Sequence, residues 1–209
     1  MGELMTIKNI GFIGLGAMGS VMAPLIVKSG CNVLGYDIKA KIDKLSGVKQ
    51  VEDINEFNGL DVIIFMLPNG RVVSEMAIKL LEKNLKSVFI DMSSSDPRET
   101  QELGNKLKYK NVKFLDAPVS GGVARAKTGD LMIMAGGDKK LLEEVNDLFI
   151  LAFISYPRTL HPDFTISGAI TEPIAPRPIN PIFLIVISSP IFELYLYSTF
   201  RNKAFNLKF

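Results

Sequence analysis

The chain has 209 residues, of which 24 are basic and 22 are acidic, and its formal net charge is +2. This length supports one hydrophobic core plus an appendage. The balanced charge forms no basic stripe, which argues against nucleic acid or an acidic surface as a partner and favours a small molecule. Cys31 has no second cysteine to pair with, so we expect a small buried side chain in a reducing, cytoplasmic environment.

Six apolar runs in the first 149 residues are typical of strands, at residues 9–14, 32–37, 61–67, 87–92, 112–117 and 131–137. Amphipathic segments lie between most of them, at residues 17–29, 70–83, 97–107 and 138–148, and Pro97 suits a first helical turn. Strands that alternate with helices require crossover connections. The pattern therefore predicts an α/β domain over residues 1–149 with a doubly wound, mainly parallel sheet.

The composition changes after residue 149. Residues 150–209 hold seven of the eleven prolines but one of the seventeen glycines, and helical periodicity disappears. We expect an atypical proline-rich apolar tail without an independent core. A membrane span over residues 179–200 is an alternative, but Pro181, Pro190 and Glu193 interrupt it, so we expect no membrane partner.

A glycine-rich turn joins the first predicted strand to the first predicted helix, with Gly14, Gly16 and Gly19 in the pattern G-x-G-x-x-G. The three glycines suit a tight turn, a close approach of pyrophosphate to the backbone, and close packing of helix on strand. Unpaired N–H groups at the helix N-terminus attract phosphate. We predict a Rossmann-type dinucleotide site formed by Gly14, Leu15, Gly16, Ala17, Met18 and Gly19. A tight turn without a ligand is the alternative.

Asp37 ends the second predicted strand, 21 residues beyond Gly16. A carboxylate at this place accepts hydrogen bonds from the ribose hydroxyls of adenosine and repels a 2′-phosphate. This favours NAD over NADP as the cofactor. Nearby Lys39 and Lys41 leave NADP open, and a solvated aspartate in a turn is the other alternative.

Four sequence blocks occur in an order that resembles the β-hydroxyacid dehydrogenases. This family comprises 3-hydroxyisobutyrate dehydrogenase, tartronate semialdehyde reductase and related enzymes, and is distantly similar to 6-phosphogluconate dehydrogenase. The blocks are "GFIGLGAMGSVMA" at 11–23, "MLPN" at 66–69, "DMSSSDP" at 91–97 and "DAPVSGG" at 116–122. The resemblance covers about residues 8–148. It implies an NAD-dependent oxidoreductase that transfers a hydride between nicotinamide and a small 3-hydroxyacid or semialdehyde.

The resemblance also implies roles for individual residues. Leu67, Pro68 and Asn69 would line the ribose and nicotinamide side of the cofactor, with Ser94 near the nicotinamide ribose. As an alternative, the three consecutive serines, Ser94 among them, could simply cap the helix after Pro97.

The same resemblance assigns the substrate to the "SGG" turn. The hydroxyl of Ser120 and the backbone N–H groups of Gly121 and Gly122 would bind the carboxylate of the hydroxyacid. A plain strand-to-helix turn is the alternative. The later pair Gly136 and Gly137 is expected to end a strand.

The general base cannot be identified in this sequence. The family uses a lysine on a long helix about fifty residues beyond the "SGG" turn, but the corresponding region has Gly168 and no lysine. His161 is expected to be a lone surface histidine. Tyr109 and Lys113 have the spacing of the short-chain dehydrogenases, but they join a helix to a strand, so the match is interpreted as chance. No metal-ligand cluster is present.

Three functions remain open at this point. The first is an NAD-dependent 3-hydroxyacid dehydrogenase, which is expected to turn over its substrate poorly because the lysine is missing. The second is a non-catalytic NAD-binding module, or a truncated or frameshifted product. The third possibility is a membrane-associated binding protein that inserts its tail. Members of the family are usually homo-oligomers through an all-helical second domain, whose sequence is not recognisable here. A change of reading frame near residues 145–150 would explain the abrupt change in composition.

Overall fold

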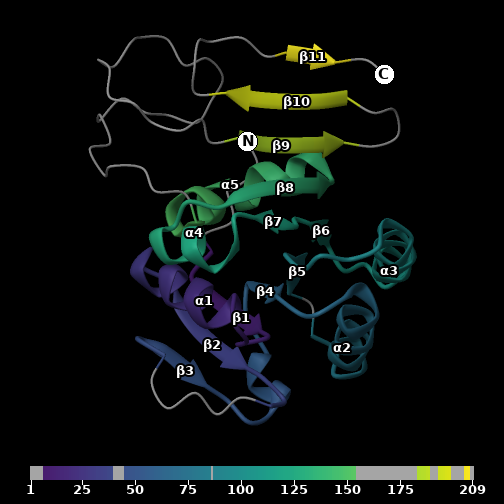
Figure 1. Cartoon of the computed structure of the whole chain (residues 1–209). Coiled ribbons are helices and arrows are strands. Elements are labelled where there is room, and N and C mark those ends of the chain that lie inside the picture. Colours follow the sequence, from purple (N-terminus) through teal and green to yellow (C-terminus); the bar gives the residue numbers. More distant parts are fainter. Residues whose placement is uncertain are drawn as a thin grey trace.

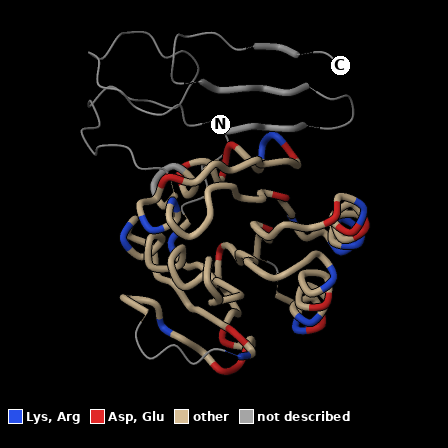
Figure 2. The backbone as a smooth tube through the Cα atoms, viewed as in Figure 1, with Lys and Arg blue, Asp and Glu red and all other residues tan. Residues whose placement is uncertain are grey.

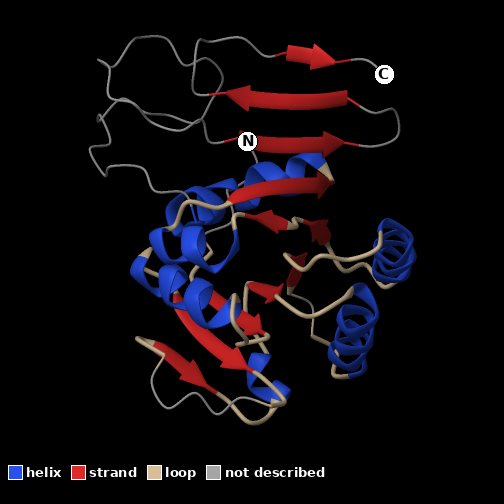
Figure 3. Ribbon diagram, viewed as in Figure 1, coloured by secondary structure: helices blue, strands red, loops and turns tan. Residues whose placement is uncertain are grey.

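The computed structural model describes residues 7–39, 45–85, 87–153, 183–188, 193–198 and 205–207. Helices cover both faces of one sheet whose central strands are parallel (Figures 1 and 3). Three residues discussed in the sequence analysis, Lys41, His161 and Gly168, lie outside the described residues.

All six predicted strands are present, and within residues 1–149 two short ones among the described residues were not predicted. The missed strands, β3 (Val48–Gln50) and β7 (Val119–Ser120), have three and two residues and are too short to give an alternating or apolar run. The predicted strands are β1 (Asn9–Ile13), β2 (Asn32–Tyr36), β4 (Val62–Phe65), β5 (Val88–Asp91), β6 (Phe114–Asp116) and β8 (Met132–Gly137). Gly137 ends β8, as expected of the glycine pair.

The order of the strands confirms the doubly wound sheet. From β3 the order runs β3-β2-β1-β4-β5-β6-β8, and β1 to β6 are parallel in this path. The chain moves from β1 to β2 on one side and later returns to β4 on the other side of β1. In sheets of this kind, ligands bind where the order reverses, outside the carboxyl ends of the strands.

The register aligns the carboxyl ends of these strands. Tyr36, Ile13, Phe65, Asp91 and Asp116 are partners across β2, β1, β4, β5 and β6. The loops that follow these five residues therefore leave the sheet along one edge. The predicted cofactor and substrate residues lie in these loops, in the short strand β7, or at the first positions of the helices that follow the loops.

The helices form two layers that bury two separate cores. On one face lie α1 (Gly19–Lys28), α4 (Gly122–Thr128) and α5 (Lys139–Phe153), and on the other α2 (Gly70–Glu82) and α3 (Pro97–Tyr109) (Figure 1). A short 3₁₀ helix, η1 (Ile54–Phe57), precedes β4. Lysine, arginine and acidic residues are concentrated on α2, α3 and other outer segments, while the central strands are largely free of them (Figure 2).

Polar side chains define where α2 and α3 begin. The Asn69 side chain accepts a hydrogen bond of 3.0 Å from the Val72 backbone N–H. The Asp96 side chain accepts one of 2.8 Å from the Arg98 N–H, and Pro97 occupies the first turn. Asp96 therefore caps α3, and the alternative that serines cap this helix is wrong.

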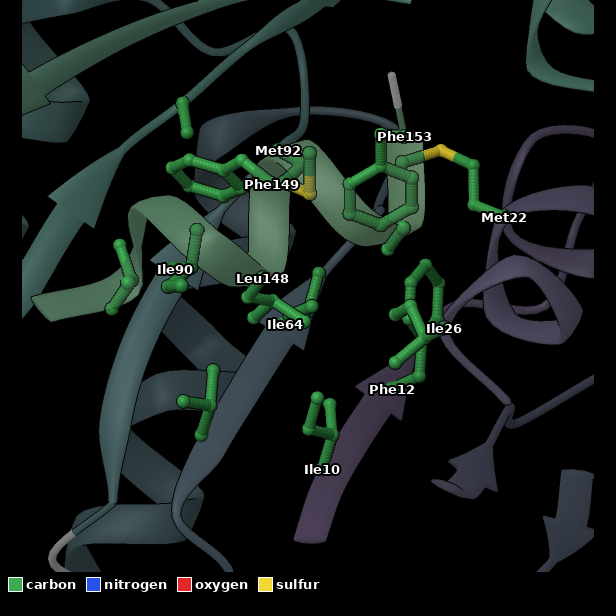
Figure 4. Close-up of a cluster of buried hydrophobic side chains, with 14 of the residues drawn as sticks. Ile10, Phe12, Met22, Ile26, Ile64, Ile90, Met92, Leu148, Phe149 and Phe153 are labelled. Carbon is green, nitrogen blue, oxygen red and sulfur yellow. The ribbon is translucent and has the colours of Figure 1, made fainter. Parts of the chain in front are cut away.

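The helix α5 closes one face of the sheet. Leu148, Phe149 and Phe153 pack with Met22 and Ile26 of α1 and with side chains of the central strands (Figure 4). The helix extends to Phe153, five residues beyond its predicted end, because Ala152 and Phe153 are also buried. The Leu131 N–H donates to the Phe153 carbonyl at 3.2 Å, so the end of α5 is bonded to the start of β8.

Three strands of the tail are described, namely β9 (Phe183–Ser188), β10 (Glu193–Ser198) and β11 (Phe205–Leu207). Strand β9 pairs in parallel with β8, and β10 and β11 continue the sheet in antiparallel order. Within the described ranges, no helix has the length and apolar character needed to cross a bilayer.

Replacing Phe149 by alanine tests the role of α5 in the core. The Phe149 side chain is fully buried, and truncation of such a residue costs about 3–5 kcal/mol of unfolding free energy. Urea denaturation of the Phe149→Ala variant should show this loss. Asp147→Ala, at an exposed position of the same helix, should stay within about 0.5 kcal/mol of the parent. Equal stability of all three proteins would contradict the packing of α5.

Candidate functional site at the carboxyl edge of the sheet

Two glycines make the turn between β1 and α1 possible. Gly14 has a φ of +97°, and a Cβ atom there would collide with the Met66 carbonyl oxygen. A Cβ atom on Gly19 would collide with the Gly14 carbonyl oxygen. The Gly14 N–H donates to the Tyr36 carbonyl at 2.9 Å, which bonds the turn to the end of β2. Both glycines are therefore needed for the turn itself.

Gly16 has a different environment, because no atom lies within 4 Å of the position that its Cβ would take. Gly16 and Ala17 are exposed. Among the described residues, no acceptor pairs with the backbone N–H groups of Ala17 and Met18. No side chain caps α1, whereas side chains cap α2 and α3, and the first turn of α1 has no acidic residue. This end of α1 offers space, N–H donors and a partial positive charge to an anion.

Leu15 and Asp37 connect the turn to β2. The Leu15 side chain is buried, and its N–H donates to Asp37 Oδ2 at 2.7 Å. The other oxygen, Oδ1, accepts from the Lys39 N–H at 2.8 Å. Asp37 is half-buried at the carboxyl end of β2, where the sequence places the ribose ligand. It therefore also holds the glycine turn in place, a role that the sequence did not reveal.

The loop after β4 lies next to the glycine turn. Leu67 is half-buried, and its N–H donates to the Ser93 hydroxyl at 2.9 Å, while Pro68 and Asn69 are exposed. The Asn69 side chain is engaged in capping α2. Leu67 and Pro68 are therefore better placed than the Asn69 side chain to face a ligand.

The three serines after β5 have three different environments. Ser93 is buried, Ser94 is exposed, and the Ser95 hydroxyl donates to Asp91 Oδ2 at 2.8 Å. Sequence reasoning missed Ser93, which joins the loops after β4 and β5. The serine run alone contains no signal that separates Ser93 from its neighbours, because their burial depends on the tertiary structure.

The "SGG" turn leaves the sheet between β7 and α4. Ser120 is exposed, and Gly121 and Gly122 have φ values of +134° and +63°, which favour glycine. A Cβ on Gly121 would lie 2.9 Å from Arg125 Cδ, whereas the space around Gly122 is open. The turn is thus a strand-to-helix connection that also leaves a hydroxyl group and bare backbone accessible. Its role in binding substrate remains a prediction.

Two aspartates occupy neighbouring positions at the end of β5 and β6. Asp91 is 1% exposed, and its Oδ1 accepts from the Ser93 N–H at 2.9 Å. Asp116 is its partner in the register and makes no hydrogen bond through its side chain to any described residue. Burial and the charge of Asp91 raise the pKa of Asp116 to about 7. A carboxyl group of this kind changes its charge near neutral pH.

Other candidate groups do not form a site within the described residues. Tyr109 ends α3 and is 87% exposed, which agrees with a chance match to the short-chain dehydrogenases. Cys31 is half-buried instead of buried, with its thiol 3.8 Å from the Ile7 carbonyl oxygen. Clusters of His, Cys, Asp and Glu that could hold a metal ion are absent from the described part of the chain.

The predicted residues thus lie on loops along one edge of the sheet. The glycine turn follows β1 at the point where the strand order reverses, with Asp37 after β2 on one side and the loops after β4, β5 and β6 on the other. This arrangement fits a dinucleotide that crosses the edge with its pyrophosphate at the N-terminus of α1.

Comparison with known proteins finds similarity over nearly the same residues as the family resemblance noted from the sequence, about residues 8–148. The family model for the NAD binding domain of 6-phosphogluconate dehydrogenase matches residues 9–152. Mitochondrial 3-hydroxyisobutyrate dehydrogenase of Drosophila melanogaster is 38% identical over 138 residues, which cover 62% of this chain and 42% of the relative. For 2-hydroxy-3-oxopropionate reductase of Escherichia coli (strain K12), identity is 36% over 150 residues, or 68% of this chain and 51% of the relative.

A solved structure shows the same fold. Mycobacterium tuberculosis 3-hydroxyisobutyrate dehydrogenase with L-serine superposes with a TM-score of 0.64 and 31% identity, covering 71% of this chain and 53% of that one. The chain therefore spans about half the length of the relatives that it matches. The match and the fold confirm the resemblance to the hydroxyacid dehydrogenases: the chain belongs to the family of the NAD-binding domain of 6-phosphogluconate dehydrogenase.

Proposed function

We propose that the chain binds NAD(H) and is the nucleotide-binding part of an oxidoreductase for small 3-hydroxyacids or their semialdehydes. The observation that carries this proposal is the uncapped N-terminus of α1, with open space at Gly16 and unpaired N–H groups at Ala17 and Met18. An uncharged turn of this shape is suited to pyrophosphate. The match of residues 9–152 to an NAD-binding family supports the same conclusion.

Different residues along the carboxyl edge of the sheet would bind different parts of the cofactor. The N–H groups of Ala17 and Met18 would bind the pyrophosphate, and Asp37 would accept hydrogen bonds from the adenosine ribose. Leu67, Pro68 and Ser94 would contact the nicotinamide side. Asp37 is negative and half-buried, which favours NAD over NADP. Bound nicotinamide supplies the hydride chemistry, and the protein supplies position.

The "SGG" turn would orient the substrate. Ser120 offers a hydroxyl donor, and the glycines at 121 and 122 allow a carboxylate to approach the backbone. The relatives from Drosophila and Escherichia coli are named for 3-hydroxyisobutyrate and 2-hydroxy-3-oxopropionate, which are small carboxylates. A small carboxylate substrate and a cytoplasmic location are parts of this proposal.

A non-catalytic NAD-binding module is the second candidate. The loops after β4, β5 and β6, at residues 66–69, 92–96 and 117–121, contain no lysine or histidine that could accept the hydroxyl proton. General base catalysis contributes typically 10²–10⁴-fold to such reactions. Substrate turnover by the chain therefore decides between the two candidates.

The variant Gly16→Val tests the position of the pyrophosphate. Open space around Gly16 and its ordinary φ let the valine fold without strain, but its side chain would occupy the space for the phosphates. NADH affinity should fall by about tenfold or more, with an unchanged circular dichroism spectrum. Gly104→Ala, on α3 next to Phe114, serves as a control that keeps affinity. Full NADH affinity in folded Gly16→Val would place the phosphates elsewhere.

Two variants separate the two roles of Asp37. The Asp37→Asn variant keeps a side-chain oxygen that accepts from the Leu15 N–H but loses the negative charge. It should therefore narrow the preference for NADH over NADPH without unfolding the turn. Asp37→Ala also removes the acceptor for Leu15, and it should weaken binding of both nucleotides by a further factor of about three to ten. Calorimetric titration with each nucleotide measures both effects. An unchanged preference in Asp37→Asn would shift discrimination to another residue such as Lys39.

The rate of substrate turnover tests whether the chain is a catalyst by itself. The 209-residue chain should oxidise 3-hydroxyisobutyrate with NAD more slowly than about 1 s⁻¹, because the loops after β4, β5 and β6 contain no lysine and the chain spans about half the length of its relatives. NADH absorbance measures the rate. A rate of about 1 s⁻¹ or more would show that the tail supplies a base. The encoding DNA provides a separate check, since a shifted frame near residues 145–150 should encode a helix with glycine and lysine.

A further inference from the structure

Two carboxylates meet at the end of β5 and β6, where the function proposed above places the nicotinamide and substrate loops. Paired residues on parallel strands point to the same face, and Asp91 and Asp116 are paired. The row that contains them otherwise holds Tyr36, Ile13 and Phe65. An acidic pair at the end of an otherwise uncharged row is not needed for packing.

The two carboxylates are not equivalent. Both oxygens of Asp91 accept hydrogen bonds, from the Ser93 N–H and the Ser95 hydroxyl. Asp116 has no hydrogen-bond donor among the described residues and is half-buried. The pair therefore keeps a proton most readily on Asp116, and burial together with Asp91 raises the pKa of Asp116 to about 7.

The other elements packed against β6 bring no charge that neutralises the pair. Strand β8 places Gly136 opposite Asp116 and has no charged residue. Lys113 precedes β6 and is paired with Glu144 at 2.8 Å. The charged residues of α3 are Arg98, which pairs with Asp96, and Glu99, Glu102, Lys106 and Lys108. Burial and Asp91 are the causes of the shift at Asp116.

The pair also lies at the start of the two loops that matter for binding. The Ala117 N–H donates to the Asp91 carbonyl at 2.7 Å, so the loop that leads to Ser120 begins on β5. Asp116 pairs with Gly136 of β8, and Ser120 pairs with Met132 of the same strand. Because these partners are four residues apart and a strand rises about 3.3 Å per residue, Asp116 and Ser120 lie about 13 Å apart. At an effective dielectric constant of about 20 to 40, a charge at this distance changes the affinity for an anion by about threefold to tenfold. Salt screens part of this effect, because Ser120 is exposed.

We infer that Asp116 controls anion binding through its proton: the Ser120–Gly122 turn binds a carboxylate well when Asp116 is protonated and poorly when Asp116 is ionised. This inference rests on the proposed function, because it assumes that a carboxylate binds at the turn. An ionised Asp116 adds a second negative charge beside Asp91 and repels the incoming carboxylate. By linkage, binding of the carboxylate takes up a proton at Asp116.

The test is the affinity for 3-hydroxyisobutyrate, measured by calorimetry on the NADH-saturated protein between pH 6.5 and pH 8.5. This pair of ligands does not turn over, since both are reduced. Affinity should fall about threefold to tenfold across this range, because Asp116 loses its proton as the pH rises through about 7. Asp116→Asn, a neutral mimic of the protonated state, should keep its affinity at pH 8.5. Asp147→Asn, exposed on α5, should behave like the parent.

Three outcomes separate this inference from the proposed function. A flat profile in Asp116→Asn and a falling one in the parent support the inference. The same slope in both proteins overturns it and leaves the proposed function intact. No binding of NADH or 3-hydroxyisobutyrate at any pH in either protein overturns the proposed function, and the inference fails with it.

A measurement without ligand tests the carboxylate pair by itself. The folded-state pKa of Asp116 lies above the ordinary value of 3.8, so the parent loses stability as the pH rises from about 4 through 7. The unfolding free energy of Asp116→Asn relative to the parent should therefore increase between pH 5 and pH 8. A constant difference would contradict the raised pKa of Asp116.

Discussion

The site depends on one close approach of two backbones. The turn after β1 passes so near the loop after β4 that a side chain at Gly14 would collide with the Met66 carbonyl oxygen. A side chain at Gly19 would in turn collide with the Gly14 carbonyl oxygen. Because these contacts fix where α1 begins, the N–H groups of Ala17 and Met18, which no described residue accepts, lie at the reversal of the strand order. The position of every other loop of the site follows from the register of the strands that support it.

Much of this could be predicted from the sequence because it depends on local patterns. Central parallel strands are buried on both faces, so β4 and β5 appear as apolar runs, and the glycine spacing marks the turn. The pairing of Asp91 with Asp116 and the burial of Ser93 could not be predicted, because both arise from contacts between distant segments. The short strands β3 and β7 and the seven-residue α4 were missed because they contain too few residues for a periodic signal.

Several residues in the family motifs serve the fold as well as the site. Asp37 holds the Leu15 N–H, Asn69 caps α2, and Ser93 joins two loops. Substitutions at such positions change both the scaffold and the ligand contacts, so loss of binding alone does not identify a ligand contact. Gly16 differs from them, because no atom lies within 4 Å of the position that its Cβ would take, and its carbonyl can still accept from the Ser20 N–H after substitution. The α1 end of the site is therefore the part whose binding role can be tested with the least disturbance of the structure.

The central claim is that a nicotinamide dinucleotide binds at the N-terminus of α1. Amide NMR spectra of the ¹⁵N-labelled chain with increasing NADH test this most directly, because the N–H groups of Ala17 and Met18 are the proposed phosphate donors. Saturable shifts of these two amides, together with that of Leu15 beside Asp37, are the predicted result. Saturable shifts confined to other parts of the chain, with Ala17 and Met18 unchanged, would contradict the account.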